Sequence, residues 1–130
     1  MTSEKPGAKA NRILVIEDTE DNRQILRDLF AAADYQLIEA VDGAAGVAMA
    51  QAERPDLILM DIQLPVLDGY EATRRIKADP ALRHIPIIAV TSYALSGDEA
   101  KVRAAGCDAS IAKPYSPRVL LAKVRGLLNE

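Results

Sequence analysis

The stretch Leu57-Ile-Leu-Met-Asp61 places four apolar residues directly before an aspartate. The apolar residues do not alternate with polar ones, so a strand formed here should be covered on both faces. Strands of this kind are typical of parallel sheets that lie between two layers of helices. The stretch therefore predicts an α/β domain with a buried sheet.

Three further runs have the length and apolar character of strands. Two of them, Ile13–Ile16 and Ile87–Val90, also lack alternation, and a weaker run from Leu37 to Val41 contains Glu39. Ala109–Ala112 is short and is predicted to form a fifth strand before the last helix. The order of these runs along the chain predicts a sheet of five strands.

The segments between the runs have helical spacing and helix boundary signals. Asp68–Glu71 and Ser96–Glu99 have the spacing of capping boxes, and Ser116 followed by proline predicts the start of a last helix that ends near Asn129. Gly106 predicts a helix stop. The first helix is expected to bury one apolar face, formed by Ile25, Leu26, Leu29 and Phe30.

Five repeats of strand and helix, joined by right-handed crossovers, predict a doubly wound three-layer α/β domain. We expect the domain to cover residues 12–130 and to follow a loose tail at residues 1–11. The 130 residues carry 16 Lys plus Arg against 19 Asp plus Glu, a net charge of −3, and 49% are hydrophobic. This composition favours one folded domain over disorder and argues against nucleic-acid binding through bulk positive charge.

The sequence shows no pattern typical of a disulfide, a Cys/His zinc site, a secretory signal or a membrane span. The single cysteine, Cys107, cannot form an internal disulfide, and one histidine cannot complete a Cys/His zinc site. The first twelve residues are polar, and no apolar run approaches the roughly 18 residues of a membrane span. We therefore expect a cytoplasmic protein that does not cross a membrane.

Polar side chains follow most of the predicted strands. Glu17 and Asp18 follow the first, Asp61 the third and Thr91 the fourth, while Lys113 comes after the fifth. Because parallel strands end at the same edge of a sheet, and ligands bind at that edge, these residues are expected to meet.

The expected chemistry of this edge is that of a metal and phosphate site. Three gathered carboxylates favour a hard cation, and a site of few protein oxygens suits Mg²⁺. Thr91 and Lys113 suit phosphoryl oxygens, and Asp61 could act as a nucleophile toward phosphorus. Each residue also has a structural interpretation: Glu17 and Asp18 could cap the next helix, and Thr91 could bond only to backbone. Lys113 could be simply solvated.

Four motifs stand in order within residues 12–128: Ile-Leu-Val-Ile-Glu17-Asp18, Asp61-Ile-Gln-Leu-Pro65-Val-Leu-Asp68-Gly69, Thr91-Ser92 and Lys113-Pro114. Together they resemble the receiver domain of two-component response regulators. The resemblance implies a flavodoxin-like sheet with strand order 2-1-3-4-5. It also implies a phosphodonor partner, either a sensor histidine kinase or a histidine phosphotransfer protein.

The resemblance assigns a role to each residue of the site. Asp61 would accept the phosphoryl group and, with Asp18, hold Mg²⁺ directly, while Glu17 would act through water and Gln63 through its backbone carbonyl. Thr91 and Lys113 would contact the phosphoryl group, and the Lys113-Pro114 peptide would be cis. Gln63 and Tyr93 fall where family members tune the rate of phosphate loss.

Output is expected to pass through a downstream protein, a phosphorelay or self-association as a homodimer, because no length remains for a DNA-binding domain. Ser110 replaces the aromatic residue that many receivers use as a switch, so a response would depend on Thr91 and the loop Ser92–Gly97. The alternative function from another class is a Mg²⁺-dependent phosphatase. Such an enzyme typically has a second acidic residue two positions after its nucleophile, where this chain has Gln63. A flavin carrier is a less favoured alternative, because the sequence has no glycine-rich phosphate loop.

The remaining polar and aromatic residues are interpreted structurally. His84 is expected in a loop, Cys107 as a small buried filler, and Arg74-Arg-Ile-Lys77 as a solvated helix face. Tyr93, Leu95 and Tyr115 could be either core residues or exposed anchors for a partner.

Overall fold

A computed structural model describes residues 11–91 and 98–129 of the chain. Five strands and five helices alternate in it: β1 (Arg12–Ile16), α1 (Glu20–Ala32), β2 (Gln36–Ala40), α2 (Gly43–Glu53), β3 (Leu57–Asp61), α3 (Gly69–Ala78), β4 (Ile87–Thr91), α4 (Asp98–Ala105), β5 (Ala109–Ala112) and α5 (Pro117–Leu127). Each predicted strand end lies within one residue of the observed one. Residues 1–10 of the predicted tail, Tyr93, Leu95, Ser96 and the switch loop Ser92–Gly97 lie outside the described ranges.

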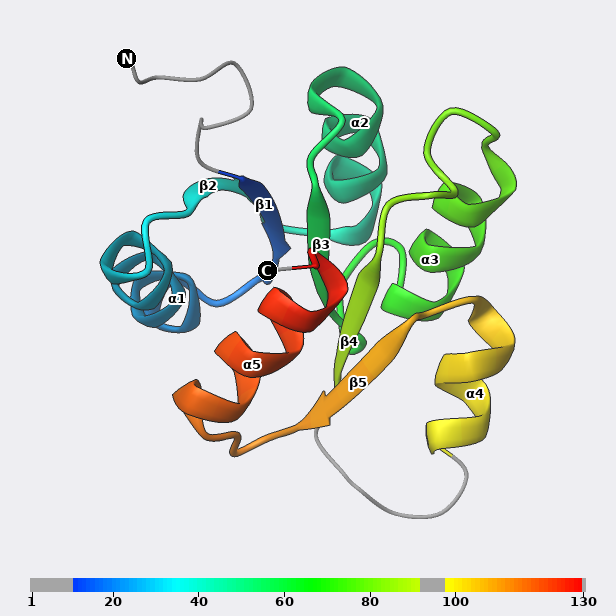
Figure 1. Ribbon diagram of the computed structural model, residues 1–130. Coiled ribbons are helices and arrows are strands. Elements are labelled where there is room, and N and C mark those ends of the chain that lie inside the picture. Colours follow the sequence, from blue (N-terminus) through cyan, green and yellow to red (C-terminus); the bar gives the residue numbers. More distant parts are fainter. Residues whose placement is uncertain (1–10, 92–97, 130) are drawn as a thin grey trace.

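The five strands form one parallel sheet in the order β2-β1-β3-β4-β5, the order that the resemblance to receiver domains implies. Figure 1 shows the strands side by side, with the helices on either side of them. The register pairs Ile16 of β1 with Met60 of β3, and Asp61 with Val90 of β4. The residues that follow β1 and those that end β3 and β4 are therefore brought to one edge.

Both faces of the sheet are buried, which confirms the prediction from the non-alternating runs. Alternate residues of β1 and β3 enter two separate cores, one shared with α1 and α5 and the other with α2 and α3. Figure 1 shows these two pairs of helices on opposite sides of the sheet. The first core contains Ile13, Val15, Leu57, Leu59, Leu26, Phe30, Leu120 and Val124. The second contains Leu14, Ile16, Ile58, Met60, Ala50, Ala72 and Ile76.

Several helix boundaries are set by the predicted signals. The Asp68 side chain caps α3 by accepting a hydrogen bond from the backbone N–H of Glu71 at 2.9 Å. Ser116 caps α5 in the same way through the N–H of Val119, at 3.4 Å. Gly106 follows the end of α4 with a φ of 106°, a conformation that glycine adopts without strain.

The predicted apolar face of α1 is wrong at one position. Leu26 and Phe30 are buried and Leu29 packs against them, but Ile25 is 58% exposed. Adjacent helical residues point about 100° apart, so the stripe centred on Leu26 and Phe30 leaves Ile25 at its margin. The second strand also ends one residue early, and Val41 is exposed.

The predicted solvated face of α3 is wrong at Lys77. Arg74 and Arg75 are exposed and pair with Glu71 of the same helix. The Lys77 side chain is only 18% exposed, and its Nζ donates to the Asp108 carboxylate at 2.9 Å and to main-chain carbonyls before β4. Lys77 therefore joins α3 to the segments that enter β4 and β5.

None of the helices within residues 11–91 and 98–129 combines the length and the apolar character that a membrane span requires.

Candidate functional site

Three carboxylates meet at the edge of the sheet where β1 and β3 end. Glu17 and Asp18 follow β1, Asp61 ends β3, and one carboxylate oxygen from each lies within 4.8 Å of the others. Glu17 is 4% exposed and Asp61 is 6% exposed, whereas Asp18 faces solvent. The predicted convergence of these acids is therefore present.

Lys113, which follows β5, places a positive charge beside two of these carboxylates. Its Nζ lies 3.2 Å from an Asp61 oxygen and 3.7 Å from a Glu17 oxygen. Partial burial lowers the pKa of Lys113, but Asp61 and Glu17 raise it by more, so the pKa lies above its ordinary value. The ammonium group is thus charged at neutral pH and is not the simply solvated lysine of the alternative interpretation.

Thr91 and Gln63 border the same carboxylates. Thr91 ends β4 and is buried, and its carbonyl accepts a hydrogen bond from the N–H of Lys113 at 2.7 Å. Gln63 is exposed, and its N–H donates to Asp61 Oδ1 at 3.0 Å. The Lys113-Pro114 peptide is cis, as the resemblance implied.

The capping interpretation holds in part for Glu17. Thr19 is the N-cap residue of α1, and its own side chain makes no capping hydrogen bond. Instead Glu17 Oε2 accepts from the N–H of Thr19 at 3.0 Å, while Oε1 faces Lys113. Glu17 therefore orders the turn before α1 and belongs to the acidic site as well.

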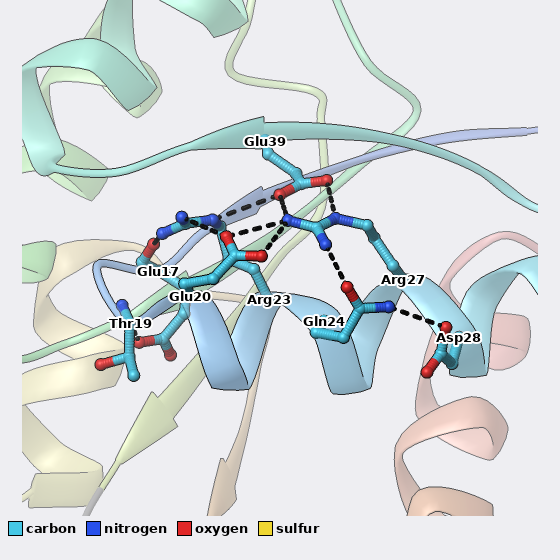
Figure 2. A network of polar contacts seen from close by, with 8 residues as sticks. All are labelled: Glu17, Thr19, Glu20, Arg23, Gln24, Arg27, Asp28 and Glu39. Carbon is cyan, nitrogen blue, oxygen red and sulfur yellow. Dashed lines mark hydrogen bonds and ion pairs between the residues drawn. The ribbon is translucent and has the colours of Figure 1, made fainter.

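An ion-pair network beside the site was not predicted from the sequence. Figure 2 shows Arg23 and Arg27 of α1 together with Glu20 and with Glu39 of β2. Arg23 also donates to the backbone carbonyl of Glu17 at 2.9 Å. One residue could have indicated the network from the sequence: Glu39 is a charged residue in a largely apolar strand, where it needs a positively charged partner.

A groove of about 460 Å³ adjoins the site between α1 and the start of α5. Glu17 and Lys113 form its inner end, and Asn22, Ile25, Pro114, Tyr115 and Pro117 line the rest. Tyr115 is half-buried and packs against the core. It therefore agrees in part with each of the two predicted roles, a core residue and an exposed anchor for a partner. Burial raises the pKa of its hydroxyl.

A second cavity lies by α4 and β5. It has a volume of about 230 Å³, and Val102, Arg103, Cys107, Ser110 and Lys123 are among its lining residues. Cys107 is half-buried, which agrees in part with its predicted role as a buried filler, and burial raises the pKa of its thiol. His84 is exposed in the turn before β4, as predicted.

Comparison with known proteins identifies the family. Residues 13–125 match the model of the response regulator receiver domain. The chain is 43% identical over 118 residues to the polar-differentiation response regulator DivK of Brucella anthropi, an alignment that spans 91% of this chain and 96% of that relative.

Solved structures agree with the sequence comparison. The receiver domain of a sensor histidine kinase from Pseudomonas aeruginosa PAO1, crystallised with a magnesium ion in its active-site cleft, is 36% identical with a TM-score of 0.87. That match covers 93% of this chain and 99% of the other. A chemotaxis response regulator of Vibrio cholerae is 25% identical with a TM-score of 0.86, over 91% of this chain and 98% of that one. With its acidic cluster at the expected edge of a 2-1-3-4-5 sheet, the chain belongs to the response regulator receiver domain family.

Proposed function

We propose that Asp61 accepts a phosphoryl group from a phosphohistidine of a sensor kinase or a histidine phosphotransfer protein. The observation that carries this proposal is the position of Asp61, a buried carboxylate beside two other acids and 3.2 Å from the Lys113 ammonium. Family membership supports a phosphohistidine as the donor. A buried charge is costly unless it is compensated, which favours a functional reason for its presence.

The proposed transfer moves one phosphoryl group between two nucleophiles. An Asp61 oxygen forms the new P–O bond while the P–N bond to the histidine breaks, and the electron pair of that bond stays on the imidazole nitrogen. Lys113 offsets the negative charge on the phosphoryl oxygens, and Thr91 offers a hydroxyl donor to them. The raised pKa of Lys113 keeps it charged for this role.

The donor set fits Mg²⁺. Three carboxylates and one lysine leave a net charge of −2 at the site, and oxygen ligands alone select a hard divalent cation. In the proposed arrangement Asp18 and Asp61 hold the ion directly, Glu17 acts through water and Gln63 contributes its backbone carbonyl. When bound, the ion supplies the positive charge that offsets repulsion between the carboxylates and the incoming phosphoryl oxygens.

We place the phosphodonor in the groove between α1 and the start of α5. The groove shares Glu17 and Lys113 with the acidic site, so a protein seated there can present a side chain to Asp61. Ile25 is an exposed apolar residue that lines this groove, so it could contact a phosphodonor protein bound there. Output is proposed to pass in the cytoplasm to a downstream protein, through a phosphorelay or through self-association. Ser110 takes the place of an aromatic switch residue.

Labelling with radioactive acetyl phosphate tests the acceptor. We expect the wild-type chain to take up one phosphoryl group in a Mg²⁺-dependent reaction, and Asp61→Asn to take up none. Asp68→Asn is the matched control, because Asp68 is an exposed helix cap and asparagine caps equally well. Full labelling of Asp61→Asn, or multiple turnovers on phosphorylated metabolites by the wild type, would contradict the proposal.

A further inference from the structure

Arg23 connects the acidic site to the rest of the fold. Its side chain is 13% exposed, and each of its three guanidinium nitrogens has a partner. Nη1 donates to the Glu17 carbonyl at 2.9 Å, Nη2 contacts Glu20 at 2.7 Å, and Nε contacts Glu39 at 3.2 Å (Figure 2). Arg23 thus ties the turn after β1 to both α1 and β2.

The ion-pair network that contains Arg23 exerts little net electrostatic influence on the carboxylates of the site. Arg23 and Arg27 share the same two acidic partners, Glu20 and Glu39, so the four side chains together carry no net charge. A neutral group leaves the balance of charge at the three acids nearly unchanged. Removal of either arginine changes the net charge of the network equally, so an effect that is specific to Arg23 must come from the geometry that its contact with Glu17 imposes.

The turn that Arg23 holds carries two of the three acids. Glu17 and Asp18 lie between the end of β1 and the Thr19 cap of α1, and Asp18 is exposed. Neighbouring carboxylates repel one another, which favours outward movement of the one that faces solvent. A rigid backbone at Glu17 opposes this movement, since the carbonyl of Glu17 forms part of the peptide bond to Asp18.

We propose that Arg23 is a positioning residue for the metal site, because it fixes the turn from which Glu17 and Asp18 reach toward Asp61. This inference rests on the proposed function, in which these acids hold Mg²⁺. Groups that orient metal ligands from outside the coordination sphere contribute roughly tenfold to a hundredfold in metal affinity.

Arg27 offers a matched control for the test. It contacts the same two carboxylates from the next turn of α1, and no contact of Arg27 with Glu17 is found among the described interactions. Arg23→Met and Arg27→Met each remove one cation from the network. Only Arg23→Met releases the Glu17 carbonyl.

The measurement is the Kd of Mg²⁺ by isothermal titration calorimetry, well below the Tm of each variant. We expect the affinity of Arg23→Met to fall roughly tenfold and that of Arg27→Met to stay within about twofold of wild type. Arg23→Lys keeps the charge and protects the fold, but its single nitrogen cannot serve all three acceptors, so a several-fold loss is expected.

Two failures can be told apart. A wild-type chain that binds no Mg²⁺ overturns the proposed function and this inference with it. If the wild type binds and the Arg23 and Arg27 variants bind equally well, or if both Arg23 variants match the wild type, only the role of Arg23 is overturned.

Discussion

Gly69 begins α3 in direct contact with the backbone that carries Asp61. A Cβ atom at this position would lie 2.5 Å from the Asp61 carbonyl oxygen and 2.7 Å from the Ile62 Cα. Both neighbours are backbone atoms, so neither can rotate away as a flexible side chain would. Gly69→Ala must therefore move α3 away from the end of β3.

The size of the effect follows from these distances. The new Cβ and the Asp61 carbonyl oxygen must separate by about 0.9 Å to reach an ordinary contact of 3.4 Å. Overpacking of this kind costs about 1–3 kcal/mol. With an unfolding entropy of about 2.1 cal/mol/K per residue over 130 residues, we expect Tm to fall by about 4–11 °C.

Calorimetry and phosphoryl labelling check this prediction together. A displacement near 1 Å at the proposed acceptor is expected to slow labelling of Asp61 by up to about a hundredfold. The matched control is Gly126→Ala in α5, where a Cβ would meet nothing within 4 Å. Alanine there should raise Tm by about 2–4 °C, since glycine costs a helix about 0.5–1 kcal/mol. An unchanged or higher Tm for Gly69→Ala would refute the packing argument.

Three further predictions concern Lys77, Cys107 and Val66. Lys77→Met should lower the stability by about 2 kcal/mol and Tm by about 7 °C, because Asp108 and two carbonyls lose a charged donor; a Tm equal to that of wild type would show that Lys77 is only solvated. Burial raises the pKa of the Cys107 thiol, so less thiolate is present at a given pH and alkylation at pH 8 should be slower than in the urea-unfolded chain; equal rates would contradict this. Val66 has a φ of 69° and is 82% exposed, so Val66→Asn should raise the stability by about 1 kcal/mol, and a lower Tm would argue against strain there.

The acidic cluster could be predicted because its residues occupy positions with an unambiguous meaning. An aspartate directly after Leu57–Met60 must lie at the end of a buried strand, and parallel strands end at a common edge. Glu17 and Asp18 follow β1 in the same way. The pairing of β1 with β3 then brings acids that are distant in sequence within 4.8 Å of one another.

The charged contacts of the helices could not be predicted in this way. A lysine or arginine on a helix looks the same in sequence whether solvent or a distant carboxylate faces it. Lys77 and Asp108 are 31 positions apart, and Arg23 meets Glu39 only because α1 packs beside β2. Ile25 was misassigned because an apolar residue at the margin of a buried stripe has the same spacing as its members.

The most direct test of the account is a crystal structure of the chain with Mg²⁺ and beryllofluoride, which stands in for a phosphoryl group. We predict that beryllium is bonded to an Asp61 oxygen, that the fluorides contact Lys113 and Thr91, and that Mg²⁺ is held by Asp18 and Asp61. A metal bound elsewhere, or beryllofluoride on a different residue while Asp61 stays free, would contradict the claim that these acids form one phosphoryl-accepting site.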